Sequence, residues 1–221
     1  MNLKSILFSG AFACGLAMSS IAGAATISVQ TTPAQVAAAT GLTGGATTTF
    51  DDLAPTSFSS ISGAGVTITS NSGTVLVSDD YPDSYNTFGN SISNDGHAFN
   101  ELYFNFAAPV SGFGFFFGAS DSPWTLTAYD AANNLLDTLV IPVLSASNAG
   151  DFFGIKAGGI AYARLSGLTS DHVFLDNFTT AAAGPISAVP EPATWAMMIM
   201  GFGLVGAMAR STRRRPIGVV A

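Results

Sequence analysis

The histidines and carboxylates in the middle of the chain are the side chains that could perform acid–base or nucleophilic chemistry. Residues 25–189 contain two histidines, His97 and His172, one glutamate, Glu101, and no cysteine. The sequence contains no G-x-S-x-G, H-E-x-x-H or P-loop motif. A glycosidase requires two opposed carboxylates, and the spacing singles out no such pair. We therefore expect a protein that is not an enzyme, and a secreted hydrolase is the least favoured alternative.

Two groups of acidic and amide side chains could instead hold a calcium ion. The first group lies within the segment DDYPDSYN and comprises Asp79, Asp80, Asp83 and Asn86. The second group lies near the first and last major strands that we expect, and comprises Asp51, Asp52, Asp176 and Asn177. Calcium takes six to eight oxygen ligands, which carboxylates, amides and loop carbonyls supply. Calcium is thus a candidate cofactor, and turn formation on an acidic surface is the alternative.

Several aromatic side chains outside the alternating core positions are candidates for contacts with sugar rings. They are Tyr81, Tyr85, Phe88, Trp124 and Phe153. Aromatic faces beside Asp and Asn suit a carbohydrate, which makes an extracellular polysaccharide a candidate partner, with packing of loops as the alternative. The run Thr47–Thr49 prompts a weaker alternative, an ice-binding surface, although no regular Thr-x-Thr array continues along successive strands.

A β-rich domain over residues 25–180 must position these side chains. Apolar and polar residues alternate with a period of two, and turns rich in Gly, Asn, Asp and Ser separate the alternating segments. This pattern predicts an antiparallel β-sandwich, mainly β and of the jelly-roll kind. The predicted strands are residues 26–30, 47–52, 65–69, 74–78, 102–106, 112–117, 124–129, 135–141, 152–155, 160–165 and 173–179.

Local signals refine this prediction. Thr32, Pro33 and Gly41 predict one helix over Pro33–Thr40, because they suit its cap, first turn and end. Asn133-Asn134 predicts a hairpin turn, since Asn tolerates positive φ. The alternating rings of residues 113, 115 and 117 predict core packing, whereas Phe116 is out of phase and faces the other side.

The first 24 residues have the three regions of a secretory signal peptide. Lys4 gives a positive start, an apolar stretch from Ile6 to about Met18 follows, and the segment ends in Ala22-Gly23-Ala24, an A-x-A cleavage pattern. We expect export through the Sec translocon and cleavage by signal peptidase after Ala24. An uncleaved anchor and lipid attachment at Cys14 are the alternatives.

A charge-free apolar segment at residues 193–209 predicts a transmembrane helix. Its helical length of about 25 Å falls slightly short of a bilayer core of about 30 Å, and Trp195 and flanking arginines can anchor it at the two interfaces. The basic residues that follow are Arg210, Arg213, Arg214 and Arg215. Because basic flanks stay in the cytoplasm, the middle of the chain, with 13 acidic and two basic residues over 25–189, faces outward.

This end of the chain resembles the PEP-CTERM sorting signal of Gram-negative bacteria in its PEPxxWA form. The matching residues are Pro190, Glu191, Pro192, Trp195 and Ala196, ahead of the apolar segment and the arginines. The resemblance implies an exosortase-type transpeptidase as partner, cleavage near the motif, and passage from the inner membrane to the cell surface or extracellular matrix, often with exopolysaccharide and biofilm. The two prolines also hold the chain extended ahead of the helix, as a protease cleft requires. A retained membrane anchor is the alternative.

Short phrases of the middle, such as FDDL and LDNF, resemble the galactose-binding-like or jelly-roll ectodomains that accompany such tails. The expected organisation is a signal peptide (1–24), a β-sandwich (25–180), a linker (181–189), the sorting signal (190–215) and a tail (216–221). A formal charge of −7 argues against nucleic-acid binding. We expect a non-enzymatic exported surface or matrix protein, with a carbohydrate-binding module, for which calcium is a candidate stabilising ion, as the alternative.

Overall fold

The computed structural model describes residues 23–94, 100–168, 171–182 and 201–202. The chain divides into two compact units, 1–186 and 187–221. In the second unit the description covers only Gly201 and Phe202, which are helical. No helix among the described residues is long and apolar enough to cross a membrane. Most of the predicted signal peptide and of the segment 193–209 lies outside the described residues.

The first unit is mainly β, and its described strands form a 12-stranded antiparallel sheet. One 3-10 turn, η1 (Pro33–Gln35), and one short helix, α1 (Val36–Thr40), follow the first strand. The strands are β1 (Ala25–Gln30), β2 (Thr47–Thr48), β3 (Ser57–Phe58), β4 (Ile61–Gly63), β5 (Val66–Ser70), β6 (Val75–Ser78), β7 (Ser91–Ser93), β8 (Glu101–Gly118), β9 (Trp124–Tyr129), β10 (Leu135–Ile141), β11 (Asp151–Ser166) and β12 (Phe174–Ala181).

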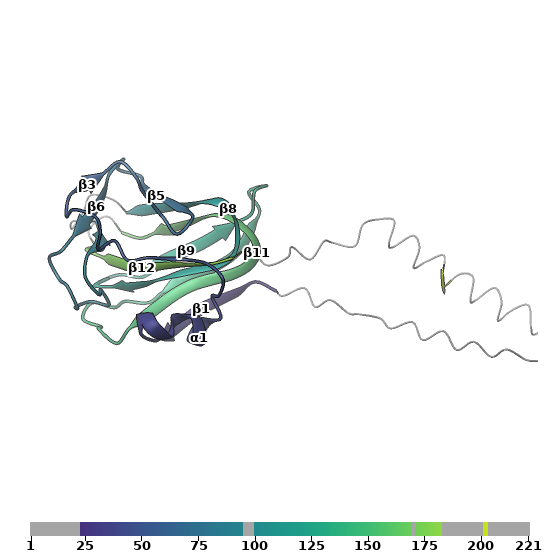
Figure 1. The fold of residues 1–221 in the computed structure, drawn as a ribbon, viewed down its shortest axis with the longest axis horizontal. Coiled ribbons are helices and arrows are strands. Elements are labelled where there is room, and N and C mark those ends of the chain that lie inside the picture. Colours follow the sequence, from purple (N-terminus) through teal and green to yellow (C-terminus); the bar gives the residue numbers. More distant parts are fainter. Residues whose placement is uncertain (1–22, 95–99, 169–170, 183–200, 203–221) are drawn as a thin grey trace, which may run out of the picture. The chain divides into compact units, whose positions relative to one another are not determined.

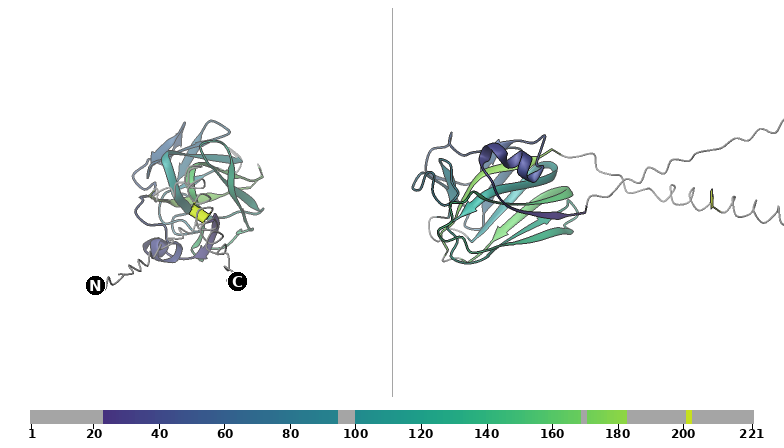
Figure 2. Two further views of the ribbon diagram at one scale, coloured as in Figure 1. Left: turned by 90° about the vertical axis from the view of Figure 1, so that its right-hand side faces the viewer. Right: turned by 90° about the horizontal axis from the view of Figure 1, so that it is seen from below.

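The two long strands β8 and β11 serve both layers of a sandwich (Figure 1). Their halves 101–105 and 162–166 pair with each other and lie between β5 and β9, which continue to β4 and β10. Their other halves, 112–116 and 152–156, pair with each other and lie between β12 and β1. Register shifts between Lys156 and Tyr162 separate the two halves. The sheet therefore folds over on itself, and the layers face each other (Figure 2).

Aromatic rings fill the space between the layers. Phe104 from one half of β8 packs with Phe113 and Phe115 from the other half, and Phe178 of β12 stacks on all three within 5.9 Å. A second cluster contains Phe116 and residues of β1, α1 and β11, on the opposite side of β8. The predicted core role of the alternating phenylalanines is confirmed, as is the prediction that Phe116 faces the other side of the strand, where it is fully buried.

The observed strands differ from the predicted ones in two ways: some predicted strands are joined into one, and one predicted strand is cut short by a turn. The segments 102–106 and 112–117 are one strand, as are 152–155 and 160–165, because the backbone stays extended through the residues between them. The predicted strand 47–52 is only Thr47–Thr48, since Phe50 has φ 66° and Leu53 N donates to Phe50 O. The short strands β3, β4 and β7 lack enough residues to show a period.

The predicted helix and hairpin are confirmed with small changes. The first three residues of the predicted helix form η1 and the rest form α1. Gly41, with φ 71°, ends the helix. Between β9 and β10, Asn133 has φ 65° and its backbone N–H donates to Asp130 O. The Asp130 carboxylate accepts from the backbone N–H groups of Ala132 and Asn134, which fixes the turn.

Trp124 belongs to the core and not to a sugar-binding surface. Its side chain is fully buried and contacts Phe117 edge to face. Its indole Nε1 donates to Asp171 Oδ2 at 2.7 Å, and the same carboxylate accepts from Ser122 and from the backbone N–H of Asp121. Burial raises the pKa of Asp171, but these hydrogen bonds outweigh burial and leave that pKa below its ordinary value. Asp171 thus holds residues 121–124, at the start of β9, in place through these hydrogen bonds.

Replacing Asp171 with Ala should lower the free energy of unfolding by about 2–3 kcal/mol, because the buried indole N–H loses its acceptor. Asp171→Asn, which keeps one acceptor oxygen, should cost less. Chemical denaturation followed by Trp fluorescence measures both. Asp121→Ala, at an exposed carboxylate of the same turn, is the matched control. Equal stability of Asp171→Ala and Asp121→Ala would contradict this role.

Candidate functional site

Two members of the first predicted calcium group, Asp80 and Asn86, form hydrogen bonds within and around their own loop. The Asn86 amide donates to Phe117 O and Asp151 Oδ2 and accepts from the backbone N–H groups of Gly150 and Asp151. Asp80 accepts from Ser78 Oγ at 2.8 Å. Among the described residues, no three His, Cys, Asp or Glu side chains gather as metal ligands do. Asn86 therefore ties the 79–90 loop to the start of β11.

Of the second predicted group, the structure brings Asp51 and Asp176 to the same loop. Asp176 is fully buried and its Oδ2 accepts from Phe88 N at 2.7 Å, while Asp51 Oδ1 accepts from Asn90 N at 2.9 Å. Burial chiefly, helped by the nearby Asp51 charge, raises the pKa of Asp176 to about 7. Asp52 is exposed in the adjoining turn, and Asn177 is buried with φ 48°.

Calcium at the Asp51–Asp176 pair stays a prediction. A cation bound there would stabilise the native state by mass action, so the melting temperature would rise in millimolar calcium relative to EDTA. An unchanged melting temperature would contradict the prediction.

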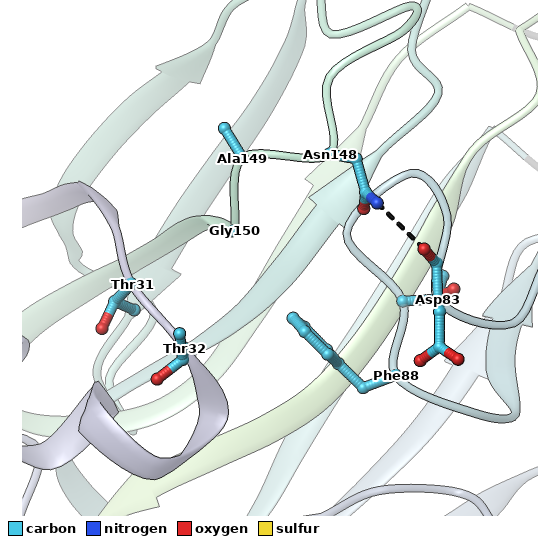
Figure 3. Close-up of a pocket in the computed structure, with 8 residues that line it drawn as sticks. Thr31, Thr32, Asp83, Phe88, Asn148, Ala149 and Gly150 are labelled. Atoms are coloured by element: carbon cyan, nitrogen blue, oxygen red, sulfur yellow. Dashed lines mark hydrogen bonds between the residues drawn. The ribbon is translucent and has the colours of Figure 1, made fainter.

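A small pocket lies beside the 79–90 loop (Figure 3). Its volume is about 210 Å³, and Phe88 lies between the Thr31–Thr32 segment and the side formed by Asp83 and Asn148. The Asn148 amide donates to Asp83 O at 2.9 Å. Ligand pockets usually enclose about 300–1,000 Å³, so this one is too small to be the leading site. A second hollow beside α1 has no charged or aromatic side chain in its lining.

The outward side of the layer built on β9 is lined with polar and aromatic side chains in register. In one row across the strands lie Thr67, Asn105, Tyr162, Tyr129 and Leu135. In the next lie Thr69, Tyr103, Arg164, Thr127 and Thr138. A third contains Glu101, Ser166, Thr125 and Val140. We call this surface the tyrosine face; each of its side chains is half-buried or exposed.

Direct contacts hold the rings of the tyrosine face in place. Tyr129 and Tyr162 stack with ring centroids 4.8 Å apart and planes 8° from parallel. The Tyr103 hydroxyl donates to Glu101, which also forms an ion pair with Arg164. The hydrogen bond from Tyr103, together with Arg164, lowers the pKa of Glu101 against the opposing effect of burial, and Glu101 in turn raises the pKa of Tyr103.

The aromatic residues proposed from sequence fall elsewhere. Phe153 is in the core at 3% exposure, while Tyr81 and Tyr85 pack on Phe174. Alternation could have revealed part of the tyrosine face, since Thr125, Thr127 and Tyr129 occupy every second position of a strand whose other positions are buried. The register of strand pairing places these residues beside residues of β8 and β11, and the sequence alone does not determine that register.

Of the remaining predicted positions, some lie among the described residues and others do not. His172 lies beside Ser93 at 3.0 Å and packs on Phe174. Thr47 is exposed on β2, and its hydroxyl is 2.9 Å from that of Thr179. Ala24 is exposed ahead of β1. The other predicted positions lie outside the described residues: His97, Ala22, Pro190, Glu191, Pro192, Trp195, Ala196 and the four arginines of the tail.

Asp176→Asn should flatten the pH dependence of stability between pH 4 and 7. Because the native pKa is raised to about 7 from 3.8, the native state holds a proton that the unfolded state releases, and stability falls as pH rises through this window by up to about 1.4 kcal/mol per pH unit. Urea denaturation across pH 4.5–8 measures the slope. The exposed Asp52→Asn serves as control, and equal slopes in wild type and Asp176→Asn would refute the assignment.

Comparison with solved structures gives only distant likenesses. The structure of TmCBM61 in complex with beta-1,4-galactotriose has 13% identity and a TM-score of 0.32, covering 53% of this chain and 88% of that one. A DUF4465 family protein from Bacteroides caccae has 10% identity and a TM-score of 0.30, covering 63% and 87%. Both TM-scores are below 0.5, so neither likeness bears on a ligand. No curated protein matches the sequence.

The C-terminal part of the chain gives a direct match. Residues 188–215 match the model of the PEP-CTERM protein-sorting motif, which contains the Pro-Glu-Pro residues and the arginine cluster identified in the sequence. The motif implies export toward the cell surface of a Gram-negative bacterium and processing by exosortase-type machinery. The resemblance is thereby confirmed, and the chain is a protein that carries a PEP-CTERM sorting motif.

Proposed function

We propose that this chain is a non-catalytic component of the cell surface or extracellular matrix, associated with exopolysaccharide. The signal peptide directs it through the Sec translocon, and the segment 193–209 holds it in the inner membrane as a transmembrane helix. An exosortase-type transpeptidase then cleaves near Pro190–Pro192 and releases the β-sandwich outward. The observation that carries this proposal is the sorting motif at residues 188–215.

The state of the titratable side chains supports a non-catalytic role. Asp171 is bound to Trp124 and Ser122, Asp176 to the backbone of Phe88, and Glu101 to Arg164. A general base or nucleophile must instead reach a substrate within hydrogen-bond distance. Each of these carboxylates is engaged in positioning a strand or a loop. These three carboxylates thus have partners that account for their burial and charge.

Replacing Glu191 with Ala should block processing, because the motif loses its charged centre while both prolines remain. We expect the unprocessed precursor to accumulate in the inner-membrane fraction and the surface form to disappear. Cell fractionation with intact-mass measurement of the C-terminus tests this. Pro185→Ala, a proline outside the motif, should leave processing unchanged. A surface-localised wild-type form that still ends at Ala221 would overturn cleavage and favour a retained anchor.

A further inference from the structure

The tyrosine face is the open side of the sandwich. The second layer is covered on its outer side by the cluster around Phe116, to which β1 and α1 contribute. The outward side chains of β8, β9 and β11 in the first layer have no such cover among the described residues, and Tyr103, Tyr129, Tyr162 and Arg164 remain partly exposed there. An exposed surface of aromatic rings that no other element covers is typical of a binding site.

We propose that the tyrosine face binds an extended, neutral polysaccharide. This proposal depends on the proposed function in one respect only, namely that export brings the protein to the cell surface, where polysaccharide is present. The apolar C–H faces of sugar rings pack against tyrosine rings, and sugar hydroxyls find partners in the surrounding Thr hydroxyls and the exposed Asn105 amide. All the side chains in the middle row carry a polar group, which is the mixed chemistry that a sugar surface presents.

Charge selects a neutral polymer over an acidic one. Residues 25–189 carry 13 acidic and two basic side chains. The three rows of the tyrosine face contain one of each, Glu101 and Arg164, and these form an ion pair. The face itself is therefore neutral, while the domain around it repels polyanions at long range. Because Arg164 is already neutralised by Glu101, it offers little net attraction to a uronic acid chain.

The polarity of the face also argues against a protein partner. The centre of a protein–protein interface is usually apolar, with aromatic and Arg side chains enriched and other charged side chains depleted. Here Thr69, Thr127 and Thr138 place hydroxyls along the middle row beside Tyr103 and Arg164, and the exposed aliphatic side chains of Leu135 and Val140 lie at the β10 edge. A polymer of hydroxylated rings matches this distribution better than a second protein does.

The face is rigid and wide enough for a polymer. Stacking fixes Tyr129 against Tyr162, and Glu101 fixes Tyr103, so binding would order few side chains and lose little entropy. The middle row runs over β5, β8, β11, β9 and β10. Four spacings of about 4.8 Å make this path about 19 Å wide. That width accommodates several linked sugars in place of a single one.

Affinity electrophoresis tests the proposal on the full chain purified in mild detergent. The probes are the neutral and acidic fractions of the polysaccharide secreted by the producing cells, with dextran and galactomannan as defined neutral polymers. We expect retardation by neutral polymer and none by the acidic fraction. Tyr162→Ala should weaken binding about tenfold or more, since it removes one ring of the stacked pair. Tyr162→Phe should retain most of the binding.

Two controls keep the outcome unambiguous. Tyr81→Ala removes an exposed ring outside the face and should leave binding unchanged. If Tyr162→Ala lowers the melting temperature, Thr127→Glu blocks the centre of the face without removing a ring, and it should abolish retardation. Absence of retardation by every neutral polymer, or equal binding by wild type and Thr127→Glu, would overturn the proposal. Because purified protein is used, either result is independent of where the cell sorts the chain.

Discussion

The pairing of β8 with β11 is the constraint on which the rest of the structure depends. These strands pair along both of their halves, with a shift of register between them, so one pair of strands contributes to both layers. The shift lets the layers turn toward each other, and the rings of Phe104, Phe113 and Phe178 then close the core. Every other strand of the described domain joins this pair either directly or through a series of neighbouring strands.

Buried polar groups take the place that disulfides hold in many exported domains. The chain has one cysteine, Cys14, within its predicted leader. Loops are instead fixed by side chains with several partners each: Asn86 binds the 79–90 loop to β11, and Asp171 binds the turn before β9 to the segment before β12. Hydrogen-bond networks of this kind specify one arrangement, because removing any member leaves a buried donor or acceptor without a partner.

Sequence reasoning predicted the elements with strong periodicity and missed what depends on pairing. The strands 124–129 and 135–141 were predicted with the bounds that the structure has, because turns delimit them and their side chains alternate. Trp124 was misplaced, since its partner Asp171 is 47 residues away. Tyr103, Tyr129 and Tyr162 come from three strands, and only the register of those strands reveals that they share a face.

The distance in sequence between paired strands has a consequence for the time at which the domain folds. β1 pairs with β11, so that Thr26 meets Ile155, and β12 pairs with β8, so that Thr180 meets Phe113. Neither layer can be completed until almost the whole domain has been synthesised, and such non-local pairing slows folding. Slow folding keeps a newly made chain unfolded for longer, the condition in which a polypeptide can be threaded across a membrane.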